Sequence, residues 1–200
     1  MTLGPVMVDV AGMSLTSEEE DFLREPLVGG VILFARNFES PAQLRELTAA
    51  IRRLRHPKLL IAVDHEGGRV QRFRDGFTPI PPMRSVGEIH ARDGAAGIAL
   101  ARAIGIVIGL ELLAHGIDFS FTPVLDVDFG VSAVIGNRSF SRDAHVISIL
   151  AGALSDGLAI AGAASVGKHF PGHGFVSADS HVAIPVDERE YEAIDRIDLE

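Results

Sequence analysis

The chain has 200 residues, of which 47% are hydrophobic and 22% are charged, and its formal net charge is −9. This composition indicates a folded domain rather than a disordered chain. The excess of acidic residues argues against a protein that binds nucleic acid through a basic surface. Because the sequence contains no cysteine, it excludes disulfides, thiolate catalysis and cysteine-bound zinc. The lack of cysteine is also compatible with a reducing cytoplasm.

Short apolar runs alternate with helical patterns along the chain. Strands are predicted over 5–10, 30–34, 58–63, 118–122 and 163–168, and helices from Thr16, over 40–55, from about 87 to 115 and over 142–161. The run 59–63 is apolar throughout, which is typical of a parallel strand buried on both faces. The alternation of strand and helix therefore predicts a parallel β/α architecture.

The number of strands leaves two architectures open at this point. A complete eight-stranded β/α barrel needs about 250 residues, whereas only five strands are recognisable in this sequence. The chain therefore forms either an open five-stranded sheet or most of a barrel whose end is missing.

The most apolar stretch, 94–117, is long enough to cross a membrane. However, Arg102 and Glu111 interrupt it, and a charge near the middle of a membrane span costs about 3 kcal/mol. The first residues also lack the basic start and long apolar run of a signal peptide. We therefore expect a helix packed against a sheet and no membrane partner.

Charged residues gather directly after the third and fourth predicted strands. Asp64 and Glu66 follow the third strand and precede two arginines, Arg69 and Arg72. Carboxylates accept hydrogen bonds from sugar hydroxyls, and arginine donates to oxygen acceptors. After the fourth strand, Arg138 is within reach of the same edge of the sheet. We expect Asp126 and Asp128, which precede it, mainly to hold loops through hydrogen bonds.

The segment after the fifth strand is the richest in chemically active residues. It begins with Lys168 and His169, and it ends with Asp179 and His181. A carboxylate two residues from a histidine can fix the tautomer of the ring, and an oriented histidine is a general acid or base suited to neutral pH. A serine hydrolase could use the same pair, but the sequence has no Gly-x-Ser-x-Gly turn.

The same segment also raises the question of a metal site. His169, His173, Asp179 and His181 have side chains that can bind zinc. Their spacing matches no zinc motif, and Lys168 would place a positive charge beside the metal. We therefore expect no metal.

Four ordered blocks of the sequence resemble one known family. They read VDHEGGRVQR (63–72), FTPVLDVD (121–128), GNRSF (136–140) and KHFPGHG (168–174), the last leading to Asp179 and His181. In these blocks the chain is similar to the bacterial β-N-acetylhexosaminidases of glycoside hydrolase family 3, enzymes of cell-wall recycling in the cytoplasm. The resemblance extends over nearly all 200 residues.

This resemblance implies a (β/α)₈ TIM barrel of which the chain holds about the first five β/α units. Residues 1–200 would form the family's N-terminal domain, incomplete at its C-terminus. The implied reaction releases terminal, non-reducing N-acetylglucosamine from β-linked muropeptide fragments with retention of configuration. No metal or organic cofactor is implied.

The resemblance also assigns roles to single residues. The residues implied to bind the sugar are Asp64, Arg72, Arg138, Lys168 and His169. His181 would be the general acid/base and Asp179 its partner in a dyad. The nucleophile of the family is an aspartate beyond residue 200, so we expect little or no hydrolase activity from this chain alone.

Three other functions stay open. Within the same family, phosphorolysis is an alternative to hydrolysis. It is plausible chemically because a neutral histidine repels incoming phosphate less than a carboxylate does. A non-catalytic sugar-binding fragment would use the same loops, and a metal-dependent hydrolase would be sensitive to chelators. The sequence gives no prediction of the oligomeric state.

Overall fold

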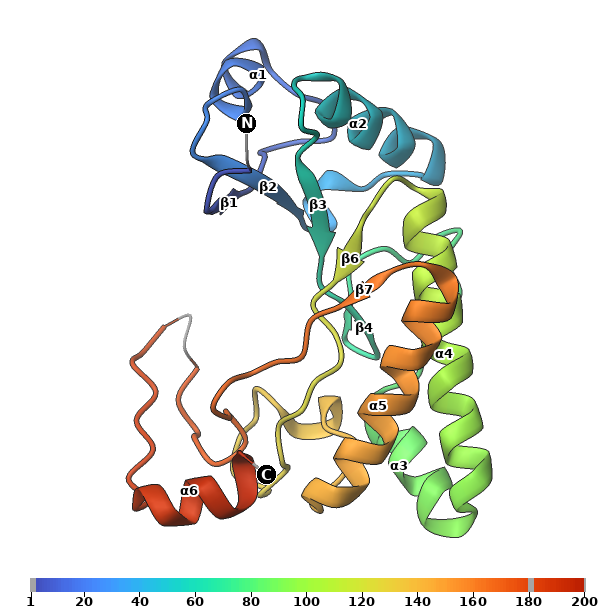
Figure 1. Ribbon diagram of the computed structural model, residues 1–200, viewed down its shortest axis with the longest axis vertical. Helices are drawn as coiled ribbons and strands as arrows, with labels where there is room; N and C mark the ends of the chain where they lie inside the picture. The colour runs from blue at the N-terminus through green and yellow to red at the C-terminus, as the bar shows by residue number, and fades with distance from the viewer. Residues whose placement is uncertain (1–2, 180–181, 200) are drawn as a thin grey trace.

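The structure is a computed structural model that describes residues 3–179 and 182–199. Its main sheet contains the strands β1 (Val6–Val8), β2 (Val28–Leu33), β3 (Leu60–Val63), β6 (Phe119–Ser120) and β7 (Ala164–Ser165). All neighbouring pairs are parallel, and the order β1-β2-β3-β6-β7 follows the chain (Figure 1). A sheet whose strands follow the chain order without reversal is the arrangement of a β/α barrel rather than of a doubly wound sheet. The prediction of five parallel β/α units is confirmed.

Helices connect these strands, and local sequence signals mark where two of them begin. The helices are α1 (Ser17–Leu23), α2 (Pro41–Arg53), α3 (Met83–Arg92), α4 (Gly94–Ala114), α5 (Ala144–Ala161) and α6 (Tyr191–Asp198). Thr16 and Glu19 form the capping box predicted for α1. Ser40 caps α2, with Pro41 as its first residue. In both cases a side-chain oxygen accepts a hydrogen bond from an otherwise unpaired backbone N–H.

The predicted helix from about 87 to 115 is wrong as a single element. Asp93 has an extended backbone, with φ −147° and ψ 100°, and separates α3 from α4. Its side chain accepts a hydrogen bond from the backbone N–H of Ala96 at 3.0 Å. Aspartate prefers a cap to a helix interior because its short carboxylate bonds to nearby backbone groups. The apolar pattern of α4 therefore begins with a new helix.

Two further elements are not among the predicted strands and helices. A small antiparallel hairpin of β4 (His65–Gly67) and β5 (Val70–Gln71) follows β3 directly. Helix α6 lies within the final acidic stretch. The hairpin matters for function because it carries Glu66 and precedes Arg72.

Helices α4 and α5 pack against each other on one side of the sheet (Figure 1). Glycines make this approach close, because a Cβ at Gly105 would overlap the carbonyl oxygen of Leu154 and a Cβ at Gly157 would overlap that of Arg102. By length and composition alone, both helices could cross a membrane. In this structure each helix packs one face against the rest of the fold, since Ile108 and Leu154 are fully buried in the hydrophobic core.

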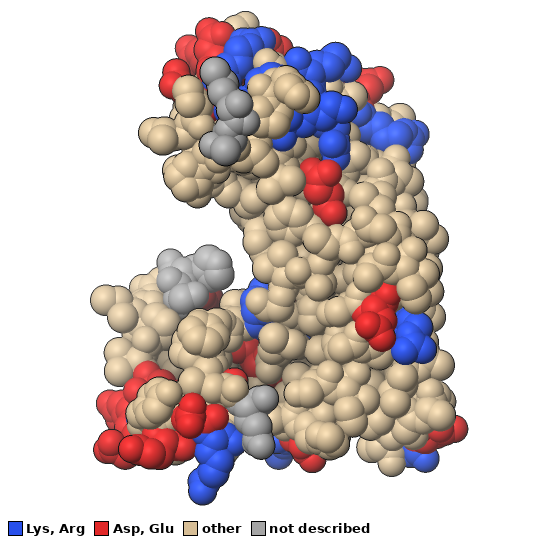
Figure 2. Space-filling model, in the orientation of Figure 1, with Lys and Arg blue, Asp and Glu red and all other residues tan. Residues whose placement is uncertain are grey.

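The opposite side of the molecule is hollowed. Figure 2 shows a deep hollow between the part formed by the first strands and the part formed by the C-terminal segment. Within the described residues the sheet stays open, because β1 and β7 each pair with a single neighbouring strand. Because β3, β6 and β7 are parallel, their carboxyl ends lie at the same edge of the sheet, and the loops that follow them meet there.

Candidate active site

A pocket of about 720 Å³ lies at the carboxyl ends of the strands. It is lined by Ile32, Asp64, Arg69, Val70, Arg72, Phe121, Ala133, Val134, Arg138, Lys168, His169, His173, Ser177 and Asp179. All five residues predicted to bind a sugar are in this list, and so is Asp179. His181 lies outside the described residues. The volume falls within the range of small-molecule sites.

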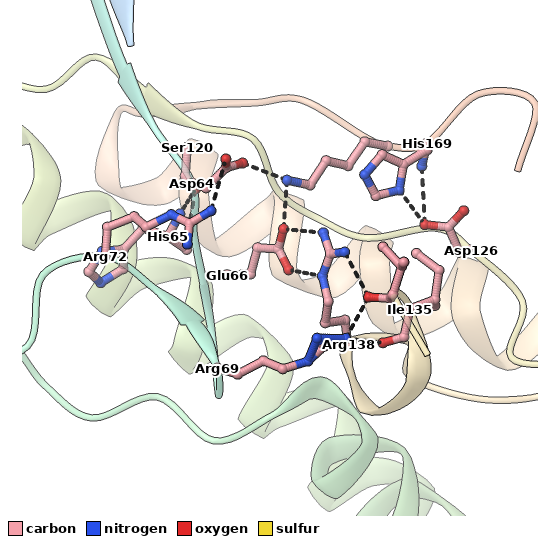
Figure 3. Close-up of polar contacts among 12 residues, drawn as sticks. Asp64, His65, Glu66, Arg69, Arg72, Ser120, Asp126, Ile135, Arg138 and His169 are labelled. Carbon is pink, nitrogen blue, oxygen red and sulfur yellow. Dashed lines mark hydrogen bonds and ion pairs between the residues drawn. The ribbon is translucent and has the colours of Figure 1, made fainter. Parts of the chain in front are cut away.

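A buried glutamate links two of the pocket cations (Figure 3). Glu66 accepts hydrogen bonds from Arg138, from Nε to Oε2 at 2.8 Å and from Nη2 to Oε1 at 2.7 Å. Nζ of Lys168 lies 2.6 Å from the same Oε1. The Glu66 side chain is only 2% exposed. Glu66 thus fixes the position of two groups that face the pocket, a role that our sequence analysis did not assign to it.

Asp64 is the second carboxylate of this network. It accepts a hydrogen bond from Nζ of Lys168 at 2.6 Å, and Nη2 of Arg72 lies 3.5 Å from its other oxygen. Burial alone would raise the pKa of Asp64, but the positive charges of Lys168 and Arg72 outweigh it and hold that pKa below the ordinary value. Asp64 is therefore ionised at neutral pH and can accept hydrogen bonds from a ligand.

Arg138 keeps its charge in spite of its burial. Burial would lower the pKa of Arg138, but the hydrogen bonds and the charge of Glu66 outweigh this and raise it. Nη1 of Arg138 also donates to the carbonyl of Val134 at 3.1 Å. The charge and the orientation of the guanidinium are thus both fixed before a ligand arrives.

Arg69 shapes one wall of the pocket. Its Nη2 donates to the backbone carbonyls of Ala133 and Ile135 at 3.0 and 3.2 Å, and also to that of Val134. These bonds connect the hairpin after β3 to the loop after β6. Arg69 therefore holds together two loops that both line the pocket.

Asp126 contacts His169 in the loop after β7. Its Oδ2 lies 2.6 Å from Nδ1 of His169, and its Oδ1 accepts a hydrogen bond from the backbone N–H of His173 at 2.6 Å. Asp126 holds a loop, as we expected, but it also touches a predicted sugar-binding side chain. Asp128 points elsewhere and pairs with Arg84 at 2.6 Å.

Metal binding was the alternative raised by the histidines that follow the fifth predicted strand. Within residues 3–179 and 182–199, no group of three or more histidine, aspartate or glutamate side chains is placed to hold a metal ion. In the structure, His169 directs Nδ1 to Asp126, and the rings of His169 and His173 are 6.1 Å apart between centroids.

The fold and the pocket define a protein of the β/α-barrel class with a charged small-molecule site at the carboxyl ends of its strands. The sequence matches the family described as "Glycosyl hydrolase family 3 N terminal domain" over residues 5–200. The chain belongs to this family, and the resemblance seen in the sequence is confirmed.

Named relatives and solved structures agree with this assignment. A "Beta-hexosaminidase" of Methylobacillus flagellatus is 62% identical over 200 residues, covering 100% of this chain and 57% of the relative. A "Beta-hexosaminidase" of Bordetella pertussis is 63% identical over 187 residues, covering 93% of this chain and 53% of the relative. The chain thus spans a little more than half the length of these relatives.

Among solved structures, native NagZ from Neisseria gonorrhoeae matches with a TM-score of 0.96 and 54% identity, over 100% of this chain and 58% of that one. A second structure of the same protein, in complex with N-trifluoroacetyl-D-glucosamine, matches with a TM-score of 0.96, over 100% of this chain and 59% of that one.

Proposed function

We propose that the chain carries the sugar-binding site of a β-N-acetylglucosaminidase. The observation that carries this proposal is the pocket, in which Asp64, Arg138 and Lys168 come from three different loops and are tied together by short ion pairs. The relatives named as hexosaminidases and the neighbour solved with a glucosamine derivative support the choice of sugar.

The chemistry of the pocket suits the hydroxyl groups of a sugar ring. Arg72, Arg138 and Lys168 supply N–H donors, whereas the ionised Asp64 supplies an acceptor. A hydroxyl group both donates and accepts, so it can bond to a carboxylate and a cation at once. The ion pairs hold these groups in place before the ligand binds, which lowers the entropic cost of binding.

The catalytic step rests on Asp179 and His181. Asp179 lines the same pocket as the sugar-binding residues. We propose that it orients the imidazole of His181, which donates a proton to the leaving oxygen in the first step and takes one from water in the second. The nucleophile is expected to be an aspartate beyond residue 200, and it would form the covalent intermediate of a retaining mechanism. The proposed substrates are β-linked muropeptide fragments in the cytoplasm.

Calorimetry with N-acetylglucosamine tests the binding half of this proposal. We expect saturable binding that weakens at least tenfold in Arg72→Met, because about 1.4 kcal/mol of lost interaction corresponds to a factor of ten. Arg74→Met is the matched control, since Arg74 is two residues away, exposed and not part of the pocket lining. Absence of binding in the unmodified chain, or equal affinity in both variants, would contradict the proposal.

Hydrolysis of 4-nitrophenyl β-N-acetylglucosaminide tests the catalytic half. We expect little or no release of 4-nitrophenol by the 200-residue chain. Turnover that is lost in His181→Ala would establish the acid/base role and would contradict the expectation that the nucleophile lies beyond residue 200. If turnover is observed, a rate that rises with added phosphate indicates phosphorolysis, and a rate that falls with a chelator indicates metal dependence.

A further inference from the structure

The carboxylate of Asp126 is completely buried and receives hydrogen bonds from two residues of the loop after β7. Its side chain is 0% exposed. Oδ2 accepts from the backbone N–H of His169 at 3.3 Å and lies 2.6 Å from Nδ1 of the same residue. Oδ1 accepts from the backbone N–H of His173 at 2.6 Å. The backbone carbonyl of Asp126 accepts a further bond from Oγ of Ser139 at 2.6 Å. Hydrogen bonds therefore hold both the carboxylate and the backbone carbonyl of Asp126 in place.

This contact determines which nitrogen of His169 carries the proton. A carboxylate only accepts hydrogen bonds, so Nδ1 of His169 must be the protonated nitrogen. In the neutral ring the lone pair then lies on Nε2. The His169 side chain is 35% exposed and lines the pocket, so Nε2 is the ring nitrogen left to meet a ligand (Figure 3).

An acceptor at this place complements the rest of the pocket. Arg72, Arg138 and Lys168 are donors only, and the acceptor Asp64 already bonds to Lys168. With Nδ1 directed to Asp126, the lone pair of the neutral ring lies on Nε2, where it can accept a hydrogen bond from a sugar hydroxyl. The opposite tautomer would present one more donor and leave that hydroxyl proton without a partner, which costs binding energy.

We propose that Asp126 is a positioning residue for sugar binding, because it makes Nε2 of His169 a hydrogen-bond acceptor in the pocket. The proposal rests on the proposed function for the identity of the ligand. It goes further by assigning the tautomer of His169 and the residue that sets it. Asp126 itself does not line the pocket.

The test combines two measurements on the 200-residue chain at pH 8. Long-range ¹H–¹⁵N spectra of the imidazole rings report the tautomer, and calorimetry with N-acetylglucosamine reports the affinity. In the unmodified chain we expect His169 to be protonated on Nδ1. In Asp126→Asn the amide can donate to Nδ1, so we expect protonation on Nε2 and an affinity at least tenfold weaker.

Asp128→Asn is the matched control. It removes the same charge from the same loop, but Asp128 pairs with Arg84 and Arg142 instead of His169. We expect the tautomer of His169 to be unchanged and the affinity to stay within twofold of that of the unmodified chain.

Two results would overturn the inference. Protonation of His169 on Nε2 in the unmodified chain would do so without any variant, so the test does not depend on whether Asp126→Asn folds. An affinity of Asp126→Asn within twofold of the unmodified chain would also do so. If the unmodified chain binds no N-acetylglucosamine, the proposed function fails, whereas the spectra still decide the tautomer.

Discussion

Arg138 and Glu66 form a two-point ion pair that is almost completely removed from solvent. Their side chains are 10% and 2% exposed, and the hydrogen bonds measure 2.8 and 2.7 Å. Lys168 approaches the same carboxylate at 2.6 Å. One buried negative charge therefore compensates two cations from two other loops, and the shape of the pocket depends on it.

Replacing Glu66 with glutamine tests this dependence. The variant keeps the size of the side chain but leaves Arg138 buried without its full counter-charge, so we expect it to lose about 3 kcal/mol of unfolding free energy. The comparison variant is Asp156→Asn, which breaks the exposed pair with Arg102 at 3.4 Å. That pair should contribute less than about 0.5 kcal/mol. Urea denaturation measures both, and equal stability of the two variants would contradict the role of Glu66.

His65 should make the stability of the fold depend on pH. The ring is 1% exposed and lies 5.9 and 5.5 Å from the rings of Phe73 and Phe77. Neither ring nitrogen has a hydrogen-bond partner among the described residues. Burial lowers the pKa of His65 to about 4 from its ordinary value of 6.5, and the charge of Arg74 adds to this. The folded state therefore keeps His65 neutral under conditions in which the unfolded chain binds a proton.

The sign of the effect follows from this difference. Well above pH 6.5, His65 is neutral in both states and its contribution to stability is constant. Between pH 6.5 and about 4 the unfolded state gains a proton that the folded state does not, so stability falls as the pH falls. We expect a loss of about 2 to 3 kcal/mol between pH 7 and pH 4.5.

Urea midpoints at these two pH values measure the loss. The part that is due to His65 should disappear in His65→Leu, whereas His145→Leu, at an exposed position, should behave as the unmodified chain does. The same pH dependence in all three proteins would contradict this assignment.

The contact between α4 and α5 gives a third prediction. Gly105→Ala would push a methyl group into the carbonyl of Leu154, and we expect it to destabilise the fold by about 2 kcal/mol through overpacking. Gly152→Ala is the control, because it lies in α5 with no atom within 4 Å of the added carbon. It should stabilise the fold by up to about 1 kcal/mol through helix propensity. Thermal unfolding compares the two, and destabilisation of similar size in both would contradict the packing.

The sequence predicted those parts of the fold that depend on local interactions. Ser40 and Pro41 mark the start of α2 with their own side chains, and the apolar run of β3 marks a buried strand. The break at Asp93 was missed because Ala, Gly and Ile continue the apolar pattern on its far side. The structure shows the break through the extended backbone of Asp93 and its hydrogen bond with Ala96.

The residues of the candidate site were also predictable only in part. Asp64 and Lys168 could be named from the motifs that contain them. The role of Glu66 and the contact of Asp126 with His169 could not, because the partners are distant in sequence: Lys168 lies 102 residues from Glu66, and His169 lies 43 residues from Asp126. Only tertiary structure brings these loops together. One signal was present: Glu66 belongs to the same ordered block as Asp64 and Arg72.

Chemical-shift mapping with N-acetylglucosamine tests the central claim most directly. Backbone amide spectra of the 200-residue chain are recorded as the sugar is added. We predict saturable shifts that cluster at Asp64, Arg138 and Lys168 and in the loops that contain them, with no change on the outer faces of α4 and α5. Saturable shifts that cluster away from this pocket, or no saturable shifts at all, would contradict the account.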